Sequence, residues 1–439
     1  MAEQSSGRDT SSGSQAPEAA EAPEAGRGIL QRMLRNTGKV LSGKGVGGVL
    51  DLAFLALAAR ALGPAEFGVM TLIVSYVQLV RGLAKFQSWQ AVVRYGAHSL
   101  ETGRIDGFHR LIAVTVLVDL VTAVAAAMLA GVLVPLVGPT LGWPPEVFAP
   151  AVWFCAVIVF TMKSTPNGLL RLFGRFDLLG AFGALVPGAR CLLGAVALLA
   201  NAGLSGFLVA YGVATALGAV FVVAVAIREL RRRALFPPRV PRLRGVTADH
   251  PGLTGFLLYA NANASLQLLP RHLAPLLVGA LLGPTPAGLF RIAQTCADAL
   301  SVPAKMLGRS IYPDLSRLVA AGGVAGMRAP LLRAGAVAAG AAVAVWLLLT
   351  ATGEWLLGAA VGPSYLSAYP ALVLLGLASV LPSVAFPAEP TLFALGRPGT
   401  VSWIRALEVT LYLGALAGLA PIGGLTAAAA AAPIAAAVG

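Results

Sequence analysis

Apolar runs of about 20 residues recur along the chain from residue 43 onward, separated by short breaks rich in Gly, Pro or charged residues. A helix of that length matches the hydrocarbon thickness of a bilayer. Of the 439 residues, 57% are hydrophobic and only 12% are charged, about half the charged share of a soluble domain. The chain is therefore expected to be an all-α membrane protein with about 12 transmembrane helices, and a soluble globular fold is excluded.

The connections between the expected spans alternate in basic residues. The spans lie at 43–62, 67–94, 108–137, 147–171, 177–200, 205–227, 254–282, 287–312, 328–352, 366–393, 400–420 and 425–439. Every second connection holds two to seven Arg, with seven at 228–245, whereas the others hold no Lys or Arg. By the positive-inside rule, this asymmetry predicts a multi-pass protein of the cytoplasmic membrane with both termini in the cytoplasm.

An internal repeat divides the spans into two sets of six. Three short motifs recur at similar offsets: Gly63-Pro64 as Gly283-Pro284, Val137-Gly138-Pro139 as Val361-Gly362-Pro363, and Gly174-Arg175 as Gly396-Arg397. Six is an even number, so both halves cross the membrane in the same orientation. The expected fold is two six-helix lobes related by a pseudo-two-fold axis along the membrane normal. Each Gly-Pro step is expected to end one helix in a left-handed cap and to begin the next with proline.

These features divide the chain into a disordered cytoplasmic tail (1–36), an N-terminal lobe (37–227), a basic cytoplasmic linker (228–253) and a C-terminal lobe (254–439). The first 27 residues hold mainly Ser, Gly, Ala, Pro and Glu without an apolar run, so no cleaved signal is expected there. The basic residues that produce the net charge of +13 cluster in the connections expected to be cytoplasmic. It therefore favours contact with anionic membrane lipids, and nucleic acid is not expected as a partner.

Ionisable and amide side chains lie well inside the first, second, seventh and eighth spans, where each charge facing lipid costs about 2.5–3.5 kcal/mol. The candidate binding residues are Asp51 in the first span, Gln78, Arg81 and Lys85 in the second, Asn261, Gln267 and Arg271 in the seventh, and Arg291, Gln294, Asp298 and Lys305 in the eighth. Cations outnumber carboxylates in this set, which indicates a water-accessible cleft for an anionic substrate. Each residue could instead snorkel to the interface or form a buried ion pair. Lys163 and Arg190 look like end anchors or structural pairs, and Asp119 has no assigned role.

The stretch from Gly38 to Ala97 resembles the opening of the oligosaccharide and polysaccharide flippases of the multidrug/oligosaccharidyl-lipid/polysaccharide (MOP) exporter superfamily. The resemblance rests on Ser42-Gly43 in the first helix, on the motif ARALGPAEFG from Ala59 to Gly68, and on a long second helix. It implies two six-helix lobes around a central cavity lined by helices 1, 2, 7 and 8.

The function implied by the resemblance is alternating-access flipping of a polyprenyl-pyrophosphate-linked oligosaccharide for cell-surface polysaccharide assembly. Glycosyltransferases or a polymerase of the same pathway are the further partners to consider. Neither a cofactor nor a metal ion is expected, and no catalytic residue is assigned.

Other functions fit the sequence less well. A drug/cation antiporter of the same superfamily would need deep carboxylates in the N-terminal lobe, where Asp51 and Asp119 are the candidates. A membrane enzyme of glycan assembly would need a sizeable extracytoplasmic loop, and neither HExxH nor GxSxG is present. The segment GKVLSGKG (38–45) approaches an ATP-binding loop, but Gly45 stands where a hydroxyl would hold Mg²⁺. Its glycines are instead expected to permit close helix packing at Gly43, Gly47 and Gly48.

Overall fold

The computed structural model describes residues 22–236, 250, 252–298, 328–384 and 398–438. The described residues form helices without β-strands, in agreement with the expected all-α membrane fold. In chain order these are α1 (Ala22–Ala84), α2 (Ser88–Glu101), α3 (Ile105–Thr140), η1 (Pro145–Val147), α4 (Phe148–Cys155), α5 (Val157–Thr161), α6 (Ser164–Leu172), α7 (Phe176–Leu199), α8 (Gly203–Arg232), α10 (Leu253–Leu282), a helix at 284–298, α12 (Arg328–Val361), η3 (Pro363–Ala368), α13 (Tyr369–Val384) and α15 (Pro398–Val438).

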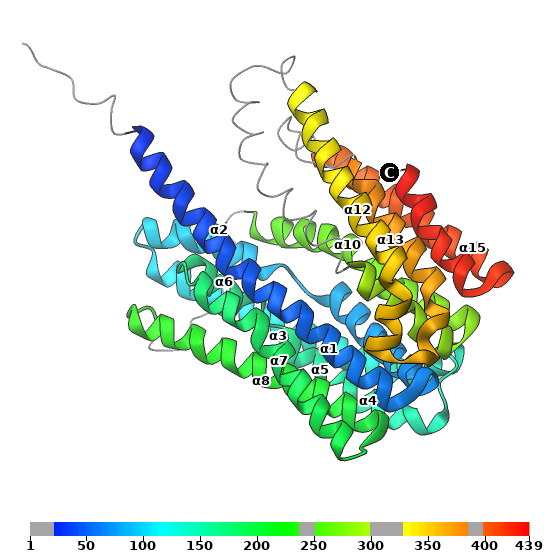
Figure 1. Ribbon diagram of the computed structural model, residues 1–439. Helices are drawn as coiled ribbons and strands as arrows, with labels where there is room; N and C mark the ends of the chain where they lie inside the picture. Colours follow the sequence, from blue (N-terminus) through cyan, green and yellow to red (C-terminus); the bar gives the residue numbers. More distant parts are fainter. Residues whose placement is uncertain (1–21, 237–249, 251, 299–327, 385–397, 439) are drawn as a thin grey trace, which may run out of the picture.

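Eight segments of the described chain are long and apolar enough to cross a bilayer. Two of these, Ser42–Glu101 and Trp403–Val438, are bent at glycines and turn back on themselves, as Figure 1 shows for α1 and α15. Large apolar side chains cover the outer surface, with Val132 75% exposed and Leu199 83% exposed. Such an apolar surface is suited to contact with lipid tails. The helices also satisfy their own backbone hydrogen bonds, as a lipid environment requires.

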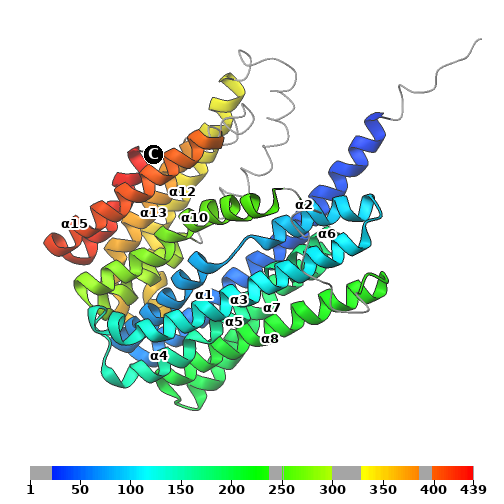
Figure 2. The same cartoon turned by 180° about the vertical axis from the view of Figure 1, so that it is seen from behind.

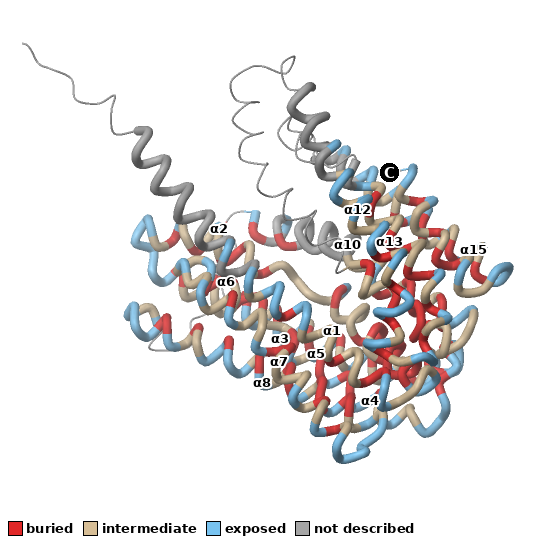
Figure 3. The backbone as a smooth tube through the Cα atoms, in the orientation of Figure 1, coloured by how far each residue is buried: buried red, intermediate tan, exposed pale blue. Residues whose placement is uncertain are grey.

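The helices form two lobes, α1 to α8 and α10 to α15, which meet at one end of the molecule and diverge toward the end where α1 and α12 begin (Figures 1 and 2). Buried residues gather inside each lobe and where the lobes meet, whereas the outer faces are exposed (Figure 3). The start of α10 also reaches the first lobe, because Leu253 and Leu257 pack with Ala91 of α2 and Leu111 of α3.

The Gly-Pro steps place the same backbone conformation at equivalent points of both lobes. Gly63 has φ 71° and ψ 172°, and Gly283 has φ 94° and ψ 177°. The positive φ agrees with the sequence expectation, but the left-handed cap is wrong because ψ is extended. The following Pro64 and Pro284 explain this difference, since proline pushes the preceding residue out of the helical ψ range. Glycine is required at both positions, because this region is essentially closed to other residues.

The repeat is less regular at the other motifs. Gly362 has φ 104° directly before Pro363, but Gly138 lies inside α3, and the positive φ of that turn belongs to Gly142. Here Leu141 and Trp143 donate backbone hydrogen bonds to the carbonyl oxygen of Gly138. The helix therefore continues through Pro139 and ends at Thr140. Gly396 lies outside the described residues.

The end where the lobes meet carries reciprocal contacts between them. Arg60 of α1 donates Nε–H to the carbonyl oxygen of Ala360 at 2.9 Å and a second hydrogen bond to that of Ala359, in the last turn of α12. In return, the Tyr365 hydroxyl donates to the carbonyl oxygen of Ala59 at 2.8 Å. Nearby, a Cβ on Gly68 would lie 2.0 Å from the Pro284 carbonyl oxygen, so only glycine permits this approach. We call the contacts of Arg60 and Tyr365 the reciprocal caps.

Helix α1 packs closely against α7 through glycines on both sides. A Cβ on Gly43 would lie 1.9 Å from the carbonyl oxygen of Gly180, and one on Gly47 would lie 2.1 Å from that of Gly183. This confirms the expected packing role of Gly43 and Gly47. The same expectation is wrong for Gly48, which has open space around it, because it points away from the crossing.

Three expected helix boundaries differ from the structure. The span expected at 67–94 is interrupted at residues 85–87, between α1 and α2, and the span expected at 147–171 is interrupted at Ala156 and again at residues 162–163. Apolar periodicity does not reveal such breaks, because both sides of each break are equally suited to helix. The tail expected to be disordered to residue 36 is helical from Ala22, where Ala, Glu, Leu, Gln and Arg favour helix and Pro23 lies in the first turn.

Candidate functional site

Arg81 lies at the centre of a group of charged side chains contributed by both lobes. It occupies the last turn of α1 and is within electrostatic range of Arg190 on α7 and Arg271 on α10. Helices α1 and α10 are in contact at this level, because a Cβ on Gly82 would meet the Leu268 side chain at 2.7 Å. Candidate residues of the second and seventh expected spans, Arg81 and Arg271, therefore lie within electrostatic range of each other across the interface between the lobes.

On the side of the first lobe, Arg190 is held by three partners. Its Nη1 lies 3.1 Å from Oδ1 of Asp51, its Nη2 lies 3.4 Å from the Thr215 hydroxyl, and its Cζ lies 3.8 Å from the centroid of the Tyr211 ring. The Tyr211 hydroxyl also accepts a hydrogen bond from the Gln78 amide at 2.5 Å. Tyr211 therefore positions Arg190 and Gln78 together.

On the side of the second lobe, proline exposes a backbone acceptor to the site. Pro275 has no N–H, so the carbonyl of Arg271 four residues earlier lacks its helical partner. Arg291 reaches this carbonyl from the neighbouring helix at 3.4 Å and also lies 3.3 Å from Oε1 of Gln294. The Arg271 and Asp298 side chains form an ion pair at 4.0 Å, and they are 56% and 45% exposed. Charged groups this exposed within a membrane-spanning region are expected to face water and not lipid.

A second group of polar residues lies where the two interrupted spans face each other. Asp119 of α3 is buried, and its carboxylate accepts hydrogen bonds from the Ser88 hydroxyl at 2.6 Å and from the backbone N–H and hydroxyl of Thr165 at 2.9 and 2.8 Å. These donors belong to the first turns of α2 and α6. Lys85 precedes α2 and Lys163 precedes α6.

The structure brings most of the candidate residues together. Eight of them lie in this interface: Asp51, Gln78, Arg81, Lys85, Arg271, Arg291, Gln294 and Asp298. Lys305 and the side chains of Asn261 and Gln267 lie outside the described residues.

Sequence reasoning missed the part that Arg190, Lys163, Tyr211 and Asp119 play here. For Arg190 the available signal was its depth, near the middle of α7. The apolar pattern gave no comparable signal for Tyr211. It is recognisable only through the side chains that it contacts.

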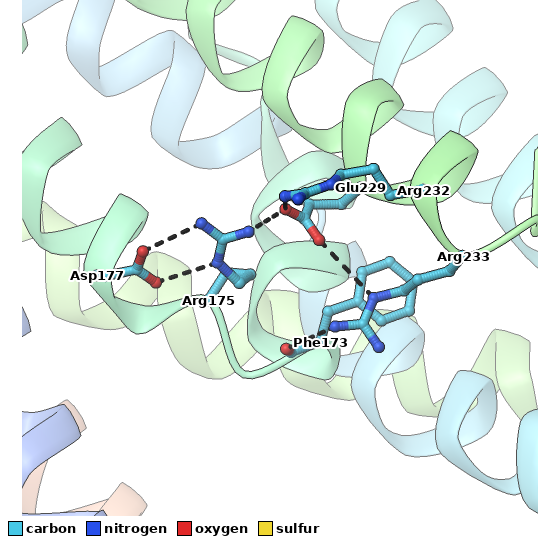
Figure 4. Close-up of polar contacts among 6 residues, drawn as sticks. All are labelled: Phe173, Arg175, Asp177, Glu229, Arg232 and Arg233. Atoms are coloured by element: carbon cyan, nitrogen blue, oxygen red, sulfur yellow. Dashed lines mark hydrogen bonds and ion pairs between the residues drawn. The ribbon is translucent and has the colours of Figure 1, made fainter.

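A separate charged cluster joins the end of α8 to the turn between α6 and α7 (Figure 4). Buried Glu229 forms an ion pair with Arg175 and lies 3.7 Å from both Arg232 and Arg233. Arg175 also pairs with Asp177 at 3.1 Å, and this hydrogen bond raises the pKa of Arg175 further. Arginines outnumber carboxylates, so this end of the molecule is cationic.

The comparisons with known proteins concern the sequence and the fold separately. The sequence model of the family described as "Polysaccharide biosynthesis protein" matches residues 33–319. The inner membrane protein YghQ of Escherichia coli K12 is 32% identical over 345 residues, which cover 78% of this chain and 96% of that protein.

Among solved structures, the fold is similar to two transport proteins. An inward-facing multidrug resistance MATE family transporter of the MOP superfamily matches with a TM-score of 0.67 at 15% identity, over 91% of this chain and 92% of that chain. The lipid II flippase MurJ, in an inward closed conformation, matches with a TM-score of 0.66 at 10% identity, over 89% of this chain and 83% of that chain. At such identities the similarity shows the fold alone.

Proposed function

We propose, from the premise that the chain belongs to the polysaccharide biosynthesis protein family, within the MOP superfamily of membrane flippases and transporters, that it flips a polyprenyl-pyrophosphate-linked oligosaccharide. Flipping takes place across the cytoplasmic membrane, with both termini in the cytoplasm. The cargo is destined for assembly of a cell-surface polysaccharide.

The observation that carries this proposal is the meeting of cations from both lobes around Arg81. A diphosphate diester carries two negative charges, and an isolated charge costs tens of kcal/mol to move into hydrocarbon by Born estimates. Fixed cations that belong to both lobes can hold such a group while the lobes rearrange around it. The glycan and the polyprenyl chain need no comparable charge, so the diphosphate is the part that the interface recognises.

The partners of the carboxylates disfavour an antiporter of cations. Asp51 is paired with Arg190, Asp298 with Arg271, and Asp119 accepts three hydrogen bonds. A coupling cation would have to displace these partners. We therefore assign the drug/cation antiporter second place, and we propose no catalytic step.

The surroundings of the cargo site fit the same pathway. The exposed arginines at the end of α8, among them Arg232 and Arg233, are suited to anionic lipid headgroups. Glycosyltransferases or a polymerase of the same pathway would supply and consume the cargo.

The test is a flipping assay with reconstituted protein and a lipid-linked oligosaccharide, comparing Arg81→Ala, Lys85→Ala and Arg271→Ala with the wild type at matched expression. We expect each to lower the flipping rate at least tenfold, because a charge-assisted hydrogen bond contributes about 1.5–3 kcal/mol. The flipping rate of Arg81→Lys should lie between those of the wild type and Arg81→Ala, since lysine offers a point charge in place of a bidentate fork. The control is Arg104→Ala in the exposed turn between α2 and α3. Rates equal to this control for all three variants would refute the assignment.

A further inference from the structure

The two helix breaks of the first lobe lie side by side. The backbone N–H of Trp89, in the first turn of α2, donates to the Ser164 hydroxyl at 3.1 Å, and that hydroxyl donates to the carbonyl oxygen of Phe86 at 3.2 Å. Ser164, at the start of α6, thus hydrogen-bonds to Phe86 just before α2 and to Trp89 in the first turn of α2. The first turns of two helices, each with its positive dipole end, are held together deep in the lobe.

Asp119 holds this arrangement but does not neutralise it. Its oxygens accept the hydrogen bonds of Ser88 and Thr165, so the carboxylate fixes both helix starts at once. It also attracts Lys85 electrostatically. It is the single carboxylate at the breaks among the residues that the structure describes.

Three cations share this place without an ion-pair partner among the described residues: Arg81, Lys85 and Lys163. The Lys163 ammonium contacts the ring of Phe182, 4.3 Å from its centroid, and each of the three repels the others. Arg190 is not part of this surplus, because Asp51 balances it. Arg171 is also within range of Lys85, but it is exposed and stacks on the Trp89 ring, so it is not counted here. The three other cations against one carboxylate leave two positive charges, and each uncompensated charge at membrane depth costs about 2.5–3.5 kcal/mol.

We propose that Lys85 and Lys163, one from each break, together with Arg81 bind the diphosphate of the cargo, so that the breaks form the anion subsite of the first lobe. The inference rests on the proposed function and adds to it a location and a new residue, Lys163. Two surplus positive charges match the two negative charges of a diphosphate diester. The two helix starts, which Asp119 holds together, add their dipoles in the same sense.

The experiment is titration of the purified full-length protein in detergent with inorganic pyrophosphate, followed by orthophosphate as comparison. We expect Lys85→Met and Lys163→Met each to weaken pyrophosphate binding at least tenfold, and Lys163→Arg to retain most of it. The double variant should lose less than the sum of the single losses, because both lysines contact one anion. Arg104→Met is the control, since Arg104 is exposed in the turn between α2 and α3.

Two outcomes would overturn the subsite. One is that Lys163→Met binds pyrophosphate as tightly as Arg104→Met does. The other is that phosphatidylglycerol, added to phosphatidylcholine nanodiscs, abolishes pyrophosphate binding, which would make the breaks a lipid headgroup site. Flipping assays separate this inference from the proposed function. A wild type that binds pyrophosphate through both lysines but flips no lipid-linked oligosaccharide refutes the function alone, and a Lys163→Met variant that binds and flips as the wild type does refutes the subsite alone.

Discussion

Asp119 is a single side chain on which two helix starts depend. It is 4% exposed, and its three hydrogen bonds come from α2 and α6, which are distant from each other in sequence. Helices that begin inside a lobe have free N–H groups with no water to satisfy them. A carboxylate from a third helix supplies the missing acceptor for one of them, and it adds acceptors for two hydroxyls.

Removing this acceptor should destabilise the first lobe. We expect Asp119→Ala to lower the free energy of unfolding by about 3 kcal/mol or more, because each buried donor left unsatisfied costs about 1–3 kcal/mol. Asp119→Asn keeps one acceptor oxygen and should lose less. The measurement is thermal unfolding in detergent followed by tryptophan fluorescence, with exposed Asp106→Ala in the same helix as control. Equal unfolding temperatures for Asp119→Ala and Asp106→Ala would show that the carboxylate does not hold the helix starts.

At the scale of elements, the contact between α1 and α7 depends on the absence of side chains. A methyl group on Gly43 would overlap the backbone of Gly180, and backbone atoms cannot turn aside as a flexible side chain can. Gly45, two residues further on the same helix, has nothing within 4 Å. The same alanine substitution at Gly43 and at Gly45 therefore compares a tightly packed position with an open one.

We expect Gly43→Ala to separate α1 from α7 and to destabilise the protein by about 1–3 kcal/mol, as overpacking does. Gly45→Ala should be neutral or stabilising by up to about 1 kcal/mol, since alanine favours helix. Chemical or thermal unfolding of the two variants under identical conditions is the measurement. The packing account fails if both substitutions have the same effect.

How far the sequence predicts these elements depends on the kind of signal. The turns at Gly63 and Gly283 were predictable because a Gly-Pro pair between apolar runs acts locally. The breaks before Ser88 and Ser164 were not, because they are stabilised by Asp119 from a third helix, and no local pattern encodes that partner. The site divides in the same way. Arg81 and Arg291 were predictable because each is a charged residue well inside an apolar span. Arg190 and Lys163 gain their place from tertiary contacts with Tyr211, Asp51 and Phe182.

At the scale of the whole molecule, the proposed orientation can be tested at the two ends of the lobes. Ser364 lies in η3 beside the reciprocal caps, and Arg232 lies at the opposite end of α8, and both are exposed. We expect cysteines introduced at these positions to react with a membrane-impermeant reagent from opposite faces in intact cells, with Arg232→Cys protected until the membrane is opened. The native cysteines at 155, 191 and 296 are buried or partly buried. As the control, they are replaced so that only the introduced cysteine can react. Labelling of both sites from outside would refute the predicted topology.

The reciprocal caps of Arg60 and Tyr365 oppose separation of the lobes at their end of the molecule. Each lobe satisfies backbone carbonyls in the last helical turn of the other, so parting the lobes at this end strands acceptors in both at once. At the end where α1 and α12 begin, the start of α10 links the lobes instead: the His250 ring lies 3.2 Å from the carbonyl oxygen of Gly107, and Leu253 and Leu257 pack on α2 and α3. A conformation in which the lobes part at the reciprocal caps is therefore expected to need water or other donors at the carbonyl groups of Ala59, Ala359 and Ala360.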